Sequence, residues 1–384
     1  MHLILRNFLF LSYIALIPCL GFGKIIEKPI KISAFGDAGI IFNLKSINSS
    51  SPKFIEERLK NINLLKSKDI NFLNFEGSLS RSCKIFTKKK YTFVMKPEIL
   101  IGFAKWGFNL FALANNHTLD CLDPNPTKEI NKVFNILTSK NPLIRFHGID
   151  SSAERLLKVA TMNKNQIKVG MISIKEWKNS SSTSIGNFNN RKKLFRALKN
   201  APVHIRILSL HGGIERKREP TDKIVQIAHE FVEKYDGDLV FAHHPHVLQG
   251  WEVLQSSKGK FAAIFYSLGN FLHTGMSPYG EGMGVQIMLK TKGIIPNSIK
   301  AFPLRNLSTS PRPIAFHQLS SFAAKLKPSM EHINSLKLPS GFKRKTFRLV
   351  HKKLPYSNFS IVFEKKKKNL SLEKDSSENS LVKK

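Results

Sequence analysis

Short apolar runs alternate with amphipathic stretches along most of the chain. The apolar runs are rich in β-branched and aromatic residues and end in Gly, Asn or His, a pattern typical of buried β-strands. They cover residues 32–35, 70–75, 108–114, 169–174, 204–210, 238–242, 261–268 and 284–289. Between them, apolar positions recur with helical spacing at residues 52–65, 97–106, 127–137, 191–198 and 221–235. Alternating strands and helices predict an α/β layered domain.

The first residues of the chain do not follow this alternation. Residues 1–23 combine a positive charge at Arg6, an apolar run at residues 8–17 and small residues near the end, which is the pattern of a secretory signal peptide. The run is shorter than the roughly 20 apolar residues that a bilayer span needs. We therefore expect export to the periplasm or cell envelope. Lipoprotein anchoring at Cys19 is a less favoured alternative, because the residue before a lipidated cysteine is normally small and here it is Pro18.

The regular alternation ends near residue 300, where Pro, Ser and Lys become more frequent. We expect a compact domain over residues 30–300 and a basic C-terminal extension over residues 301–384. The extension contains the run Lys365–Lys368 and ends in Ser, Glu, Asn and Lys. This polar composition predicts that about the last 20 residues are disordered.

The composition adds a strong positive charge. Of 384 residues 42% are hydrophobic, which excludes wholesale disorder, and 61 Lys and Arg against 27 Asp and Glu give a net charge of +34. Such a charge attracts polyanions, although the abundance of Lys, Asn, Ile and Phe allows part of it to reflect compositional bias. The basic residues do not alternate with aromatic ones as in RNA-binding proteins, which, with the export signal, argues against a nucleic-acid partner. Dinucleotide, P-loop and serine-hydrolase motifs are absent from the sequence.

Polar side chains capable of chemistry stand at the carboxyl ends of the predicted strands. In α/β sheets these ends border the crevice where ligands bind, so the side chains should converge on one site. They are Asp37 after the first run, Asn74 and Glu76 at the second, Asn116, His117 and Asp120 after the third, His211 after the run ending at 210, His244 and His246 after the run ending at 242, and Asn270 after the run ending at 268.

These residue types are those of a metal site. Carboxylate, carboxamide oxygen and imidazole suit Mn, Fe, Zn or Mg better than a soft thiolate site would. His244 and His246 are two residues apart, so on an extended backbone they can face the same side, whereas His243 should point away from its neighbour. We expect His204 and His229 to be structural histidines outside this site.

The same segments resemble the ordered motifs of a known family, the CapA family of bacterial poly-γ-glutamate capsule synthesis proteins. The family belongs to the calcineurin-like metallophosphoesterase superfamily, so the resemblance implies a four-layer α/β/β/α sandwich with a metal centre at the strand ends. It further implies that Asp37, Glu76, Asn116, His211, His244 and His246 are candidate metal ligands and that His117 takes the place of the general acid or substrate-polarising histidine. The matching segments are GD at 36–37, NFEG at 74–77, ANNHTLD at 114–120, HGGIE at 211–215, HHPHVLQG at 243–250 and YSLGNF at 266–271.

The chain departs from the superfamily at one expected ligand. Most metallophosphoesterases have a histidine two residues after the first aspartate, and Gly39 occupies this position here. The resemblance therefore implies either one metal ion or two unequally bound ions.

Two classes of function fit these observations. In the first, the protein is a metal-dependent hydrolase or transferase acting on a phosphoryl or amide bond, with His117 as proton donor and Asp120 as the alternative donor. In the second, the same pocket and basic surface hold an anionic polymer such as poly-γ-glutamate without turning it over, near an anionic membrane surface or the capsule synthesis machinery. The resemblance favours capsule or cell-envelope polyanion biosynthesis, with a periplasmic phosphoesterase as the alternative.

Two cysteines follow the second and third motif loops. Cys83 and Cys121 should therefore lie near one rim of the crevice. In an exported protein they could form a disulfide or remain two separate thiols. The sequence leaves both alternatives open.

Overall fold

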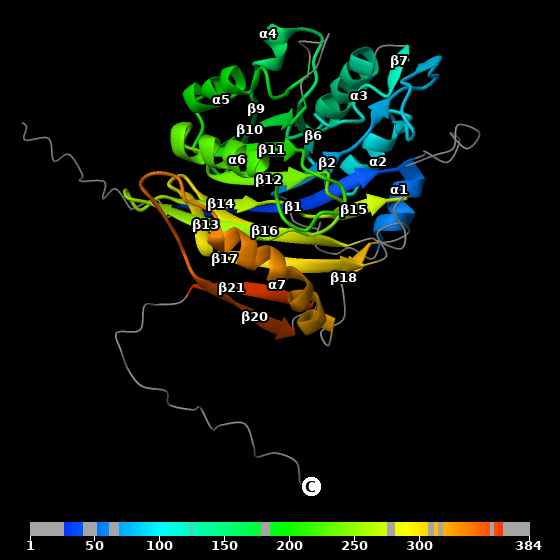
Figure 1. Cartoon of the computed structure of the whole chain (residues 1–384). Coiled ribbons are helices and arrows are strands. Elements are labelled where there is room, and N and C mark those ends of the chain that lie inside the picture. The colour runs from blue at the N-terminus through cyan, green and yellow to red at the C-terminus, as the bar shows by residue number, and fades with distance from the viewer. Residues whose placement is uncertain are drawn as a thin grey trace, which may run out of the picture.

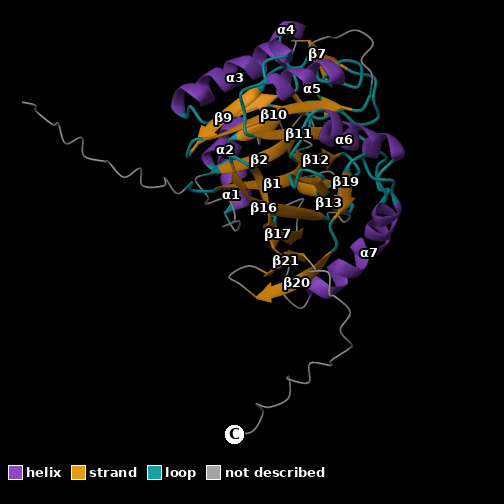
Figure 2. Ribbon diagram, turned by 90° about the vertical axis from the view of Figure 1, so that its left-hand side faces the viewer, coloured by secondary structure: helices purple, strands orange, loops and turns teal. Residues whose placement is uncertain are grey.

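Two large β-sheets packed face to face, with helices on their outer sides, make up the body of the protein (Figure 1 and Figure 2). The computed structural model describes residues 27–40, 52–60, 69–123, 126–177, 185–274, 281–305, 311–313, 318–353 and 357–363. The predicted signal peptide at 1–23, Cys19 and the predicted disordered end of the chain lie outside the described residues.

The first sheet contains the strands that lead to the polar residues predicted in the N-terminal part of the chain. It has 10 strands in the order β20-β21-β17-β16-β1-β2-β6-β8, with β15 paired to β1 and β18 paired to β17. Strands β1, β2, β6 and β8 are parallel, so their carboxyl ends lie at one edge. The bounds are β1 Ile30–Gly39, β2 Ile70–Phe75, β6 Leu110–Ala112, β8 Arg145–His147, β15 Asn270–His273, β16 Gly282–Lys290, β17 Gly293–Arg305, β18 Arg312–Pro313, β20 Phe347–Lys353 and β21 Ser357–Phe363.

The second sheet carries the histidines of the C-terminal half. Its seven strands follow the order β19-β13-β14-β12-β11-β10-β9, and β10, β11, β12 and β14 are parallel. The bounds are β9 Ala160–Lys164, β10 Ile167–Lys175, β11 Ile205–His211, β12 Leu239–His243, β13 Trp251–Ser256, β14 Phe261–Phe265 and β19 Phe342–Arg344. Two short ribbons complete the strands, formed by β3 Ser78–Leu79 with β5 Val94–Met95 and by β4 Ile85–Phe86 with β7 Cys121–Asp123.

Three hydrophobic cores separate four layers. The central core joins the inner faces of both sheets through residues such as Ile32, Phe72, Ile207 and Phe241. A second core packs helices against the outer face of the first sheet, and a third does the same on the second sheet. The helices are α1 Pro52–Leu59, α2 Ile99–Lys105 and α3 Pro126–Lys140 on the first sheet, α5 Arg191–Asn200 and α6 Asp222–Lys234 on the second, and α4 Ala153–Leu156 and α7 Leu319–Ser335. This arrangement confirms the predicted α/β/β/α sandwich.

The structure differs from the predicted elements in two places. The apolar run at 261–268 contains only one strand, β14, after which the chain turns at Gly269, with φ +63°, and enters the first sheet as β15. A separate extension after residue 300 is not confirmed, because β17 runs through that position, β21 pairs with β17 and β19 pairs with β13. Among the described helices, none is both long and apolar enough to cross a bilayer.

Candidate metal centre

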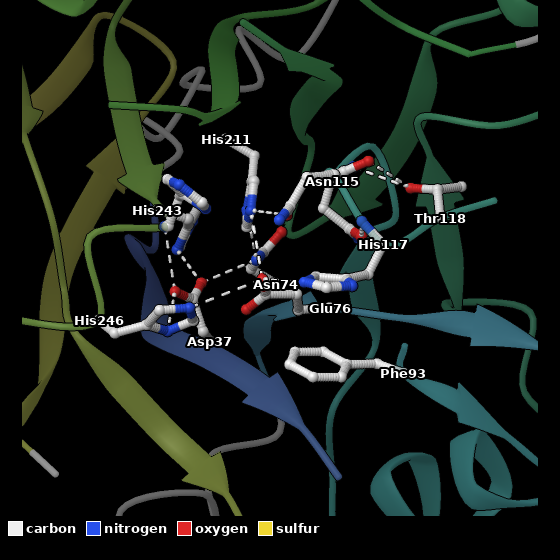
Figure 3. A network of polar contacts seen from close by, with 12 residues as sticks. Asp37, Asn74, Glu76, Phe93, Asn115, His117, Thr118, His211, His243 and His246 are labelled. Atoms are coloured by element: carbon white, nitrogen blue, oxygen red, sulfur yellow. Dashed lines mark hydrogen bonds and ion pairs between the residues drawn. The ribbon is translucent and has the colours of Figure 1, made fainter. Parts of the chain in front are cut away.

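The carboxyl ends of the parallel strands of both sheets meet at a dense cluster of buried polar side chains (Figure 3). The structure brings together the ten residues that the sequence singled out, and it adds His243 and His273. Residues more than 200 positions apart are in direct contact here, as for Asp37 and His244. His204 and His229 make other contacts, His204 with the amide of Lys168 and His229 with Glu252, as expected for structural histidines.

Asp37 is turned into the cluster by an irregularity in β1. Ile32 and Ala34 face the central core, but the register with β2 shifts between Phe35 and Asp37, so Asp37 also points between the sheets. Gly36 permits this path, because a Cβ atom there would lie 2.0 Å from the carbonyl oxygen of Gly269.

The Asp37 carboxylate is held by three neighbours. Its Oδ1 accepts a hydrogen bond of 2.8 Å from Asn74 Nδ2, and its Oδ2 accepts one of 3.1 Å from the His244 amide. His243 Nδ1 lies 3.3 Å from Oδ1. Burial opposes ionisation, but the hydrogen bond and charge of His243 hold the pKa of the Asp37 carboxyl below its usual range.

His243, which the sequence left doubtful as a site residue, also points into the cluster. Leu239 and Phe241 of the same strand face the central core, and the two-residue period of a strand puts His243 on that side as well. The expected extended backbone at His244 and His246 is wrong, since their φ angles are +99° and +56°. Such strained conformations persist where surrounding contacts fix them, here the bond from the His244 amide to Asp37.

Glu76 lies at the centre of the cluster and is completely buried. Among the described residues, neither of its carboxylate oxygens has a hydrogen-bond partner. Its Oε1 lies 3.5 Å from His211 Nε2 and 3.8 Å from His246 Nε2, while Oε2 lies 3.8 Å from His273 Nε2. Burial, reinforced by the negative charge of Asp37, raises the pKa of Glu76 to about 7. A buried carboxylate without donors is the environment that a cation would relieve.

His211 and His244 form one group of donor atoms with Glu76. Their ligand atoms and a carboxylate oxygen of Glu76 lie within 4.8 Å of one another. Asn116 Oδ1 joins this group, because it lies 2.9 Å from His211 Nε2. Two ligand atoms that are each about 2.1 Å from a metal lie about 3 Å apart at a right angle, so this spacing suits adjacent ligands.

His246 and His273 form a second group with the same glutamate. Their nitrogens and a Glu76 oxygen also lie within 4.8 Å of one another. Asn270 Oδ1 is 2.9 Å from His246 Nδ1, which leaves Nε2 directed toward Glu76. The sequence analysis missed His273. The available signal was its place on the same strand as Asn270, two residues after the end of the YSLGNF segment.

Asn74 connects the two sheets behind these ligands. Its Nδ2 donates to Asp37 Oδ1 and lies 3.2 Å from His211 Nδ1. One carboxamide therefore positions a ligand from each sheet.

The imidazoles are mostly in the form that binds metals. Burial lowers the pKa values of His211, His244 and His273 well below the ordinary value. These rings are therefore neutral near pH 7, as metal ligands must be. For His246 burial acts in the same direction, but the charges of Glu76 and Asp37 outweigh it and raise the pKa. The chemistry of this donor set fits one or two divalent cations.

His117 and Asp120 form a pair beside the ligand groups. Asp120 is buried, and its Oδ2 lies 2.5 Å from His117 Nδ1. The ring of His117 stacks on Phe93 with 3.8 Å between centroids, and its Nε2 is 3.9 Å from Glu76 Oε1. Because Asp120 lies behind the ring, His117 presents Nε2 to the cluster and Asp120 orients it.

A disulfide cross-links two segments at the rim of the site. Cys83 and Cys121 are bonded, with Cα atoms 5.7 Å apart, which decides between the two alternatives that the sequence left open. Cys121 directly follows Asp120, and Asp120 accepts hydrogen bonds from Lys89 Nζ and from the Phe93 amide. The cross-link thus ties the segment carrying Lys89 and Phe93 to the loop of His117.

The folds of several solved structures are similar to this chain at low sequence identity. A novel phosphatase from Mycoplasma pneumoniae has 16% identity and a TM-score of 0.45, with 72% of this chain and 94% of that chain covered. A hypothetical protein from Thermus thermophilus has 11% identity and a TM-score of 0.42, with 71% and 99% covered.

Two curated relatives are similar in sequence. The capsule biosynthesis protein CapA of Bacillus anthracis is 26% identical over 265 residues, which is 65% of this chain and 61% of that protein. The PGA biosynthesis protein CapA of Bacillus subtilis (strain 168) is 26% identical over 189 residues, 42% of this chain and 48% of that protein. The chain thus spans less than two thirds of the length of either relative.

The family comparison covers the whole site. The sequence model described as "Bacterial capsule synthesis protein PGA_cap" matches residues 31–274, from the start of β1 to the residue after His273. More than half of the chain, including all the residues of the cluster, lies in this match. The chain therefore belongs to the bacterial capsule synthesis protein family PGA_cap.

Proposed function

We propose that this protein is an exported, metal-dependent hydrolase or transferase that acts on a phosphoryl or amide bond during the synthesis of an anionic capsule or cell-envelope polymer such as poly-γ-glutamate. The observation that carries the proposal is Glu76, a buried carboxylate without hydrogen-bond donors, placed among histidines and beside the Nε2 atom of His117. Membership of the capsule synthesis family supports the polymer class.

Asp37, Glu76, Asn116, His211, His244 and His246 would hold Mn, Fe, Zn or Mg. A bound cation would supply Lewis-acid polarisation of the bond under attack. The residues of the chain prepare the rest of the site, since Asn74 and Asn270 fix the ligand orientations and the surrounding burial excludes water.

His117 is the proton donor in this proposal. Asp120 accepts from Nδ1 and Phe93 fixes the plane of the ring, so Nε2 is the atom that delivers a proton to the leaving group. Asp120 acts through His117 and positions it.

We expect His117→Ala to lower turnover by about 100-fold or more while leaving the bound metal unchanged. The reason is that His117 lies beside the candidate ligand groups without belonging to any of them. Steady-state kinetics on phosphoesters and γ-glutamyl peptides, with elemental analysis of the same samples, measure both quantities. Unchanged activity would remove His117 as the donor, and loss of metal would make it a ligand. A metal-loaded wild type that is inert on both substrate classes would support a polyanion-binding factor instead.

Two lysines give this side of the site a positive charge for an anionic substrate. Lys89 contacts Asp120, and Lys175 pairs in register with His211 at the end of β10. Lys175 is only 8% exposed, and burial followed by repulsion from Lys89 lowers its pKa to about 8. The pKa still leaves Lys175 mostly charged at neutral pH.

We expect Lys175→Met to raise KM for a γ-glutamyl polymer about tenfold, on the scale of one charge-assisted hydrogen bond. The effect should shrink as salt is added, because salt screens the attraction. The matched control is Lys290→Met, which removes an exposed lysine at the end of β16, beside the start of β1 and away from the strand end that carries Asp37. Equal KM values for the two variants at low salt would contradict a substrate-binding role for Lys175.

A further inference from the structure

Gly39 and His273 compete for the same space. A Cβ atom built on Gly39 would lie 2.6 Å from Nε2 and 2.7 Å from Cδ2 of the His273 ring. Atoms of this kind do not approach below about 3 Å, so a side chain at position 39 and the imidazole at position 273 exclude each other.

The strand register explains this proximity. Strands β1 and β15 are parallel neighbours, and Gly39 lies opposite His273 in their pairing. The last residue of β1 has no side chain, and the last residue of β15 fills the space with its imidazole. The space that a side chain at position 39 would fill is therefore occupied by the imidazole of His273, which comes from β15.

His273 has the environment of a ligand. It is 1% exposed, and neither of its ring nitrogens has a hydrogen-bond partner in the part of the chain that the structure describes. An imidazole buried without partners loses its hydration without compensation, which is rare unless another group binds there. Its Nε2 faces Glu76 Oε2 at 3.8 Å, and its ring lies 4.9 Å from that of His246.

Glu76 belongs to two of the three candidate ligand groups of the site. One consists of Glu76, His211 and His244, and the other of Glu76, His246 and His273. These two groups have no histidine in common, and the third group combines His244 and His246 with the exposed Glu215. A carboxylate can contribute its two oxygens to two cations.

We propose that His273 is a metal ligand and completes a second cation position, with Glu76 shared between the two positions. The proposal rests on the metal-dependent function above and extends it to a two-ion site. Gly39 has no side chain, and His273 on β15 supplies the imidazole at this place instead.

The test measures metal binding by the full mature chain with Mn²⁺ alone. Calorimetric titration and elemental analysis should give two Mn²⁺ per wild-type chain and one per His273→Phe chain, because the group of His211 and His244 remains. Electron paramagnetic resonance should show an exchange-coupled pair in the wild type and an isolated ion in His273→Phe. The matched control is His204→Phe, which alters a histidine bonded to the Lys168 amide and should keep two ions.

A positional swap separates ligand loss from damage to the fold. Gly39→His combined with His273→Gly places an imidazole in the same space from the opposite strand, and we expect it to restore the second Mn²⁺. Gly39→His alone should lower the melting temperature through the clash with His273. Two ions in His273→Phe, or failure of a folded swap variant to regain the second ion, would overturn the role of His273 while leaving the proposed function intact. A wild type that binds no Mn²⁺ would contradict both.

Discussion

A Glu76→Gln variant is expected to lose divalent cation from both ligand groups, with an affinity at least about 100-fold weaker than that of the wild type. Glu76 contributes to both groups that contain a buried carboxylate, and Gln keeps the size of the side chain while removing the charge. Within the described part of the chain, no donor is hydrogen-bonded to the Glu76 carboxylate in place of a cation. Elemental analysis after gel filtration, and calorimetric titration with Mn²⁺ or Zn²⁺, measure the loss.

The matched control for Glu76 is Glu252→Gln. Glu252 is equally buried, but it is bonded to His229, Tyr266 and Arg344. The control should keep its metal and lose stability, since its partners lose a charged acceptor. Equal metal content in the two variants would contradict a cation site at Glu76.

Without bound metal, the Glu76→Gln variant should be more stable than the wild type, and the difference should depend on pH. Burial raises the pKa of Glu76 from an ordinary value of 4.5 to about 7, so the folded state binds a proton more tightly than the unfolded state. This contribution is fully present below the unfolded pKa and is lost as pH rises through about 7. The Gln variant avoids the loss, and its advantage in free energy of unfolding over the wild type should grow between pH 5 and pH 8.

Removing the disulfide with Cys83→Ser and Cys121→Ser is expected to lower the free energy of unfolding by about 4 kcal/mol. The cross-link spans 38 residues, and opening it returns the conformational entropy of that loop to the unfolded chain. Urea unfolding of the oxidised wild type and the double variant measures the difference. The segment of Lys89 and Phe93 should also become more mobile, which would weaken the orientation of His117.

Thiol titration provides the control for the disulfide. Under denaturing, non-reducing conditions, no thiol from Cys83 or Cys121 should react. Two reactive thiols from these positions would exclude the bridge, and the stability difference between wild type and the double variant should then vanish.

The sequence alone determined the α/β class and most of the candidate ligands of the cluster. Apolar runs with a two-residue or near-continuous pattern specify buried strands, as for β2 and β11, and this pattern depends only on neighbouring residues. Because parallel strands end at a common edge, a polar residue directly after each run can be assigned to one site. This is why Asp37, Glu76 and His211 could be placed together before any coordinates.

The tertiary structure decided features that depend on register between distant strands. Gly39 and His273 are adjacent only because β15, entered through the turn at Gly269, pairs with β1 in one particular alignment. A shift by one residue would turn His273 to the other face of the sheet. The Cys83–Cys121 bond also depends on tertiary structure, because it joins segments 38 residues apart. Local sequence patterns fix which residues end a strand, whereas packing between strands hundreds of residues apart fixes which of their side chains lie together in the cluster.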